Sequence, residues 1–243
     1  MPADSGQSSR PPPPTPLPVD PRSAELVLFG GSFDPPHRAH FAFARFVLET
    51  VPGSSLIFVP AARSPHKSTG PIATGPQRVA MLEAGLSDLG LATDPRIGIW
   101  TDELDRAESG SEPSYFVDTL CRARSLLPAS VRVRFVIGSD QWCSLGDWRE
   151  PHAILELAAP ILLVRGASVE TTPPAPPGPS APPGSWSAAE RLLFDRAVLP
   201  HQPRFDASST QARALLANDP QCDDLDALLT PSVLHLARGI YRG

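Results

Sequence analysis

Short apolar runs alternate along this chain with segments whose apolar residues recur at helical spacing. The runs are rich in Val, Ile, Leu and Phe and end at Gly, Pro or polar residues, which predicts strands at 25–31, 55–60, 96–100, 131–138 and 159–165. The segments between them predict helices at 40–50, 76–86, 115–127 and 151–157. Such alternation is typical of βαβ units that close into a parallel sheet.

The last quarter of the chain changes this pattern. Residues 197–201 predict an edge strand, and helices are expected at 209–217 and 231–238. We therefore expect an α/β fold, a Rossmann-like, doubly wound and mainly parallel sheet with a small C-terminal helical portion. Ligands of such sheets bind beyond the carboxyl ends of the strands, where the strand order reverses.

Two proline-rich tracts do not fit any regular element. Eight prolines lie within residues 1–21 and seven within 171–184, which is 15 of the 31 prolines in the chain. Such tracts do not form helices or central strands. We expect a disordered tail over residues 1–23 and one domain over 24–243, interrupted by a Pro-rich loop at 168–187. On this interpretation, deletion of residues 2–21 leaves stability and activity nearly unchanged. Recruitment of SH3-type partners by the tracts is an alternative.

Charge and cysteine usage exclude several classes of protein. The net charge is −5, so no global basic field is present to hold nucleic acid, and any polyphosphate ligand needs a local cluster of cations. No run of about 18 apolar residues occurs, which argues against a membrane span. Cys121, Cys143 and Cys222 are widely separated and form no metal-finger pattern. We expect a reduced, cytoplasmic protein, and the sequence leaves its oligomeric state open.

The strongest candidate site directly follows the first predicted strand, in the stretch FGGSFDPPHRAH at 29–40. Its two glycines allow a ligand to approach the backbone closely, and its two histidines lie three apart where a helix begins, so both rings can face one point. Imidazole N–H groups at a helix N-terminus stabilise charge on a phosphate. A metal-binding pair is an alternative, although no third ligand stands at a recognisable spacing. The candidate residues are Gly30, Gly31, Ser32, Phe33, His37 and His40.

A second candidate lies in the stretch ASSTQAR at 207–213. Hydroxyl groups at the start of a helix are commonly plain N-caps, and that is the alternative here. Arg213 stands about one turn into the predicted helix, where a guanidinium and free backbone amides bind phosphate oxygens. The candidate residues are Ser208, Ser209, Thr210 and Arg213.

These two stretches resemble the nucleotidyltransferase superfamily with the signature G-[TS]-F-D-P-x-H-x-x-H and a late S-S-T-x-x-R. Within it, the chain is most similar to bacterial nicotinate-nucleotide adenylyltransferases, which join nicotinate mononucleotide to the adenylyl part of ATP. The resemblance covers about residues 25–243 without the second proline tract. It implies that His37, His40 and Arg213 are catalytic, that the glycines and hydroxyl residues bind ATP phosphates, and that Mg²⁺ is carried with ATP and no metal site belongs to the protein.

Three further stretches carry the resemblance to the substrate side. Residues 60–67 (PAARSPHK) look like the family's loop over the substrates, which implies a role for Lys67. Glu103-Leu104 followed by Ser114-Tyr115 resembles the block whose backbone amides meet the nicotinate carboxylate. Asp140 matches the family's G-x-D segment and Trp148 the tryptophan that stacks on the pyridine ring. A solvated loop charge, a helix start and a core tryptophan are the alternatives for these residues.

The chain also departs from the family pattern. Ala39 replaces the glycine of the usual H-x-G-H, and Ala207 and Ala212 replace larger aliphatic residues. These changes are conservative or reduce bulk, so a working site is expected. An adenylyltransferase for nicotinamide mononucleotide or another phosphate acceptor, and a non-catalytic nucleotide-binding module, are the competing functions.

Overall fold

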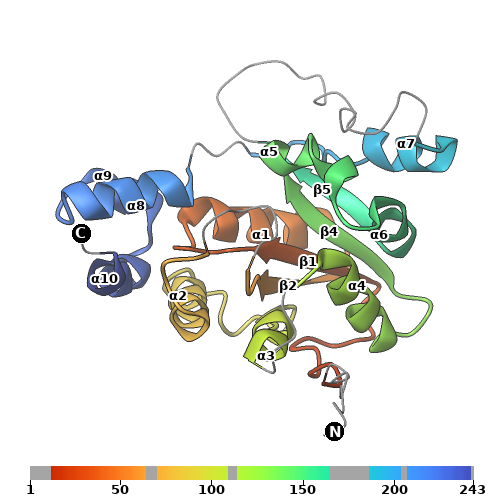
Figure 1. Cartoon of the computed structure of the whole chain (residues 1–243), viewed down its shortest axis with the longest axis horizontal. Coiled ribbons are helices and arrows are strands. Elements are labelled where there is room, and N and C mark those ends of the chain that lie inside the picture. Colours follow the sequence, from red (N-terminus) through yellow and green to blue (C-terminus); the bar gives the residue numbers. More distant parts are fainter. Residues whose placement is uncertain (1–11, 64–69, 109–113, 165–185, 204–206, 242–243) are drawn as a thin grey trace, which may run out of the picture.

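Five parallel strands form one sheet in the order β3-β2-β1-β4-β5 (Figure 1). They are β1 (Glu25–Gly31), β2 (Ser54–Pro60), β3 (Ile97–Ile99), β4 (Arg132–Gly138) and β5 (Ala159–Leu163). The computed structural model describes residues 12–63, 70–108, 114–164, 186–203 and 207–241. Since β1 pairs with β2 on one side and with β4 on the other, the strand order reverses between β1 and β4. A ligand crevice is expected at the carboxyl ends of these two strands.

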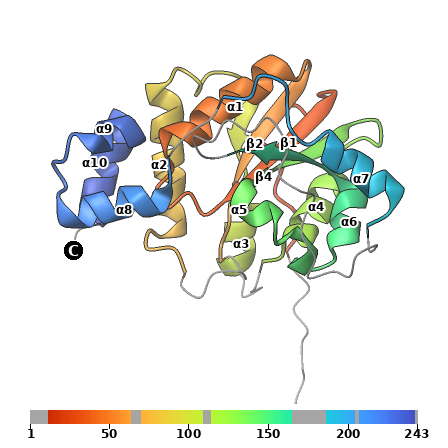
Figure 2. The ribbon, with the colours of Figure 1, turned by 90° about the horizontal axis from the view of Figure 1, so that it is seen from above.

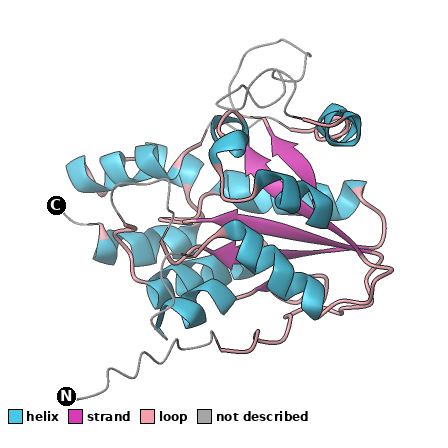
Figure 3. Cartoon of the chain, turned by 45° about the vertical axis from the view of Figure 1, so that its right-hand side comes forward, coloured by secondary structure: helices cyan, strands magenta, loops and turns pink. Residues whose placement is uncertain are grey.

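Helices cover both faces of the sheet (Figures 1 and 2). Alternate residues of β1 belong to two separate cores, Val27 and Phe29 to one and Leu26 and Leu28 to the other. The first core is closed by α1 (Arg38–Thr50), α2 (Gly75–Asp88), α8 (Ser209–Asn218), α9 (Asp224–Leu228) and α10 (Pro231–Ile240). The second is closed mainly by α4 (Phe116–Ser125), α6 (Pro151–Leu157) and α7 (Ala188–Asp195). The predicted doubly wound sheet and its C-terminal helical portion are confirmed (Figure 3).

The ends of the sheet and the connections differ from the sequence-based prediction in detail. The expected strand at 197–201 is wrong, since this segment reaches β5 through the bond from the Leu162 amide to Ala197 O at 2.8 Å but forms no strand. Pro200 has no backbone N–H to donate, and His201 has a φ of 58°. Both features interrupt the hydrogen-bond pattern of a β-strand. The pattern also missed α3 (Asp102–Glu108) and the short α5 (Ser139–Trp142). No helix in the described ranges is long and apolar enough to cross a membrane.

The amino-terminal segment packs against the domain, which corrects the expected tail. Residues 12–19, here called the N-terminal strap, are described, and Val19 is buried in the second core. Trp100 Nε1 donates to Thr15 O at 3.1 Å, and the Thr15 amide donates to Asp102 Oδ1 at 3.3 Å. A Cβ on Gly98 would lie 2.8 Å from Pro18, so β3 and the strap are in close contact.

The prediction that residues 1–23 form a disordered tail is therefore wrong from Pro12 onward. Proline excluded helix and strand there but did not prevent packing, because an extended segment with Leu17 and Val19 still buries apolar surface. Residues 1–11 lie outside the described residues, as does nearly all of the predicted Pro-rich loop at 168–187.

Deletion of residues 2–21 tests the strap. We expect the free energy of unfolding to fall by about 2–5 kcal/mol, because a buried valine and several hydrogen bonds are lost. In a chain of this size each kcal/mol corresponds to roughly 2–4 °C in melting temperature, which calorimetry measures directly. Deletion of residues 2–11 is the control, since it keeps the strap and its contacts. Equal melting temperatures for the two deletions would contradict the role of the strap.

Candidate active site

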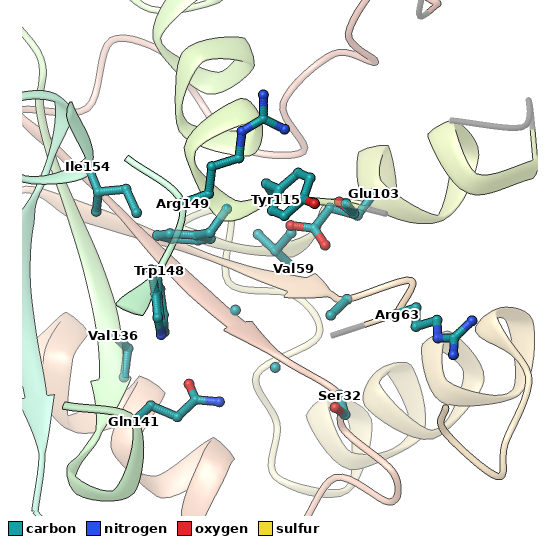
Figure 4. A pocket seen from close by; sticks show the side chains of 15 residues that line it. Ser32, Val59, Arg63, Glu103, Tyr115, Val136, Gln141, Trp148, Arg149 and Ile154 are labelled. Carbon is teal, nitrogen blue, oxygen red and sulfur yellow. The ribbon is translucent and has the colours of Figure 1, made fainter. Parts of the chain in front are cut away.

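A cavity opens at the carboxyl ends of β1 and β4, where the strand order reverses (Figure 4). Gly30 and Gly31 from β1 and Val136 from β4 are among the residues that line it. The cavity thus lies at the position that the topology of an open parallel sheet favours for a ligand. It brings together six of the residues that the sequence singled out: Gly30, Gly31, Ser32, Ser114, Tyr115 and Trp148.

Buried groups fix the turn that follows β1. The fully buried Arg78 donates through Nη1 to Ser32 O at 2.8 Å and to Ala61 O at 2.7 Å. Burial lowers the pKa of the Arg78 guanidinium, and the nearby carboxylate of Asp34 opposes this effect. Phe33 adopts a φ of 48° and directs its ring into the core, 5.0 Å from the ring of His40 between centroids. The Phe33 side chain is therefore structural, and only its backbone is available for a ligand.

The carboxylate of Asp34 joins three distant parts of the chain. It accepts hydrogen bonds from the amides of Ile72 and Ala73, each at 2.9 Å, and from the hydroxyl of Tyr241 at 2.6 Å. Burial, the hydrogen bond to Asp34 and its charge all raise the pKa of Tyr241, so the phenol remains a donor. The loop before α2 and the C-terminal end of α10 are thereby held to the turn.

The two predicted histidines stack at the start of α1. Their ring centroids are 3.6 Å apart with an interplanar angle of 21°, and both side chains are buried. The His37 amide donates to His40 Nδ1 at 3.0 Å. Because Nδ1 accepts this bond, the neutral ring of His40 carries its proton on Nε2, and Nε2–H is the group that can donate to a phosphate oxygen.

The second signature stretch reaches the same turn from α8. Arg213 donates from Nη1 to Asp34 O, and the same nitrogen lies 3.7 Å from Asp34 Oδ2. Ser209 Oγ donates to Pro35 O at 2.9 Å across 174 positions of sequence. Ser208 is a plain N-cap, since its Oγ accepts from the Gln211 amide at 3.1 Å, and Thr210 Oγ1 accepts from Arg213 at 3.3 Å. None of the four candidate residues of this stretch is among those that line the cavity.

A buried polar network supports the other wall of the cavity. Arg106 Nη2 donates to Ser114 Oγ at 3.1 Å and to Thr119 Oγ1 at 2.8 Å. Thr119 in turn donates to Glu103 Oε1 at 2.6 Å. Burial raises the pKa of Glu103, and the hydrogen bond from Thr119 and the charge of Arg106 oppose that shift. The Ser114 hydroxyl therefore links the segment before α4 to the buried guanidinium of Arg106.

Comparison with known proteins agrees with this arrangement. The sequence matches the family model Cytidylyltransferase-like over residues 28–215. A probable nicotinate-nucleotide adenylyltransferase of Chromobacterium violaceum is 30% identical over 228 residues, which cover 89% of this chain and 97% of the relative. One of Stenotrophomonas maltophilia is 33% identical over 225 residues, which cover 89% and 96%. The chain belongs to this family of nucleotidyltransferases.

Solved structures share the fold at lower sequence identity. Plasmodium falciparum nicotinic acid mononucleotide adenylyltransferase complexed with NaAD superimposes with a TM-score of 0.61 at 19% identity, over 87% of this chain and 93% of that chain. A structure of that enzyme complexed with APC gives the same TM-score over 90% and 97%. The Rossmann-like architecture is therefore that of nicotinate-nucleotide adenylyltransferases.

The lining of the cavity also does not include Phe33, His37 or His40 of the first signature stretch, or Asp140. Asp140 on α5 is exposed, whereas its neighbour Gln141 lines the cavity. Lys67 lies outside the described residues. Sequence reasoning also gave no role to Asp34, although it belongs to the signature, or to the cavity residue Arg149 beside Trp148. Tyr241 carried no signal, because its contact with Asp34 spans 207 positions and leaves no local pattern.

Asp34→Asn tests whether the carboxylate holds the turn. An amide at this position directs a donor toward one of the amides of the 72–73 loop, so we expect a loss of about 2–4 kcal/mol in the free energy of unfolding. Tyr241→Phe removes one bond and should cost about 1 kcal/mol. Urea denaturation measures both losses.

Asp88→Asn is the matched control for Asp34→Asn. Asp88 also links α2 to the C-terminal helices, through bonds from Ser232 at 2.7 and 2.8 Å, but it is exposed. Water replaces the lost hydrogen-bond partners at this exposed site, so the free energy of unfolding should fall by less than about 1 kcal/mol. Equal losses at Asp34 and Asp88 would contradict the special role of the buried carboxylate.

Proposed function

We propose that this chain transfers the adenylyl group of ATP to nicotinate mononucleotide, which gives nicotinate adenine dinucleotide and pyrophosphate, a step of NAD biosynthesis. One observation carries this proposal. The two signature stretches meet at the Asp34 turn, through Arg213 and Ser209, directly beside the cavity at the reversal of the strand order. The names of the relatives and the nucleotide complexes of the structural neighbours support the same activity.

The reaction is a direct displacement at phosphorus. An oxygen of the 5′-phosphate of the mononucleotide attacks the α-phosphorus of ATP and forms the new Pα–O bond. The bond from the α-phosphorus to the bridging oxygen of the β-phosphate breaks, and pyrophosphate leaves with the electron pair. A phosphate monoester is largely dianionic at neutral pH, because its second pKa is about 6, so no general base is needed. The protein contributes by positioning the substrates and stabilising charge.

The proposed roles follow from where the donors lie. Nε2–H of His40 and the ring of His37 serve the phosphate chain at the start of α1, and Gly30, Gly31 and Ser32, with the Phe33 backbone, allow its close approach. Arg213, with Ser208, Ser209 and Thr210 at the start of α8, serves the leaving β- and γ-phosphates. On the substrate side, Trp148 stacks on the pyridine ring, and Ser114 and Tyr115 hold the start of α4. Lys67 and Asp140 are proposed as substrate-binding residues on the family pattern alone.

The divalent cation that such enzymes use with ATP enters this proposal as Mg²⁺ bound to the nucleotide. In the part of the chain that the structure describes, no three His, Cys, Asp or Glu side chains cluster as metal ligands. Mg²⁺ commonly binds through substrate phosphates and only one or two protein carboxylates. Bound there, Mg²⁺ neutralises charge on the phosphate chain. The three free cysteines fit the reducing conditions of the cytoplasm, where we propose that the protein acts.

His40→Asn and His40→Ala test the catalytic role of His40. Asparagine retains a short acceptor for the His37 amide but loses the donor at the Nε2 position, whereas alanine loses both. We expect both variants to lower kcat by about 100-fold or more, because the donor acts on charge that develops in the transition state. Steady-state pyrophosphate release measures the effect. Wild-type turnover in His40→Asn would show that His40 only shapes the helix start.

A panel of phosphorylated acceptors tests the substrate. We expect nicotinate mononucleotide to exceed nicotinamide mononucleotide in kcat/KM by about 30- to 1,000-fold, because a carboxylate gains from the positive N-terminus of α4 and from cationic neighbours that do not favour an amide. Dinucleotide product is quantified by chromatography. Reversed preference would favour a nicotinamide-specific enzyme, and absence of product with every acceptor would favour a non-catalytic nucleotide-binding module.

A further inference from the structure

Arg149 is a cation of the cavity to which the signature motifs assign no role. It follows Trp148 in the chain and lines the same cavity. Its guanidinium carbon lies 4.5 Å from the centroid of the Tyr115 ring, and Figure 4 shows the two side chains next to each other. Cation–π attraction holds a guanidinium in such a position. The charge thus lies beside Tyr115, the residue at the N-cap position of α4.

The guanidinium retains donors for a ligand. Its Nε lies 3.4 Å from Glu150 Oε1, and the two side chains are 52% and 57% exposed, so this ion pair is weak. Within the described ranges, neither Nη group of Arg149 has a hydrogen-bond partner. A planar guanidinium supported by an aromatic ring is well oriented to bind a carboxylate through two parallel hydrogen bonds.

The cavity has two distinct ends. Figure 4 shows Ser32 and Arg63 on one side of it and Trp148 and Arg149 on the other. A mononucleotide that directs its 5′-phosphate toward the turn at Ser32 therefore presents its base ring to Trp148. A substituent on that ring then faces the wall formed by Tyr115 and Arg149.

We propose that Arg149 selects the acid form of the pyridine mononucleotide by pairing its guanidinium with the carboxylate on the ring. This inference rests on the proposed function and assigns its acid specificity to one side chain. A carboxamide has no charge to pair with Arg149, so the side chain stabilises the acid substrate and is nearly neutral toward the amide.

The buried Glu103 on the same cavity gives Arg149 a second effect. An ionised carboxyl at Glu103 would repel a carboxylate substrate, and the cation at Arg149 offsets this repulsion. Burial raises the pKa of Glu103, which also limits the repulsion, whereas the donor Thr119 and the charge of Arg106 favour the ionised form. Arg149 is the cation that remains for a ring substituent at this end of the cavity, since Arg106 is already bonded to Ser114 and Thr119.

Arg149→Met tests the proposal, with kcat and KM measured for both the acid and the amide mononucleotide at saturating ATP. Methionine keeps much of the aliphatic contact with Tyr115 and removes the charge. We expect kcat/KM for the acid to fall by about 10- to 100-fold, mainly through KM, because the pair binds ground state and transition state alike. The amide should change by less than about threefold. For Arg149→Lys we expect a kcat/KM for the acid between those of the wild type and Arg149→Met, because lysine keeps a charge but lacks the planar guanidinium.

Arg22→Met is the matched control, because Arg22 is an exposed arginine before the amino end of β1, at the opposite end of the sheet. It should leave both substrates unaffected, and melting temperatures show whether each variant is folded. Equal losses for acid and amide in Arg149→Met, or an unchanged acid constant, would overturn the assignment. Absence of dinucleotide from wild-type protein with either substrate would instead overturn the proposed function, and this inference with it.

Discussion

The candidate site depends first on the buried carboxylate of Asp34. It lies in the turn after β1 and binds the amides of the loop before α2, while Arg213 holds the backbone of the same residue. Tyr241 anchors the C-terminal end of the chain to the same oxygen as Ala73. Four segments that are distant in sequence thereby converge on Asp34, and this convergence brings Arg213 to the turn after β1.

A second buried carboxylate, Asp102, organises the opposite wall. It receives two hydrogen bonds from Arg122 at 2.7 Å and lies 3.2 Å from Arg106 Nε, and the strap donates an amide to it. Removal of one partner from such a group leaves an unpaired buried charge, whereas the complete network adds little net stability. Asp102 begins α3, which carries Glu103 into the cavity. The network therefore orients α3 and contributes little to the free energy of unfolding.

The sequence predicted the parts of the fold that apolar burial determines. The long strands are buried on both faces and therefore appear as nearly continuous apolar runs, and α1 and α10 each present a clear apolar stripe. The apolar pattern does not predict the acidic helix α3, because its buried residues include the charged pair Asp102 and Arg106. The prolines of the strap exclude helix and strand, and its two packed apolar residues, Leu17 and Val19, form no periodic pattern from which burial could be predicted. Likewise, the motifs single out the two histidines and Arg213 as candidates, but no local pattern indicates that Tyr241 reaches Asp34.

The cations Arg213 and Arg149 differ in how firmly the fold holds them, and this difference matches the tasks proposed for them. The chain as a whole carries a net charge of −5, so polyanionic substrates are attracted only by local positive groups. Arg213 is tied to the backbone of Asp34 and to Thr210, which suits the role proposed for it, because a group at the leaving phosphates must be in place when charge develops. Arg149 is held only by the aromatic face of Tyr115 and by an exposed ion pair with Glu150, and a carboxylate can replace the weak ion pair. On the proposed roles, a firmly held cation at the reacting phosphates and a more weakly held one at the pyridine ring separate the work of catalysis from that of substrate choice.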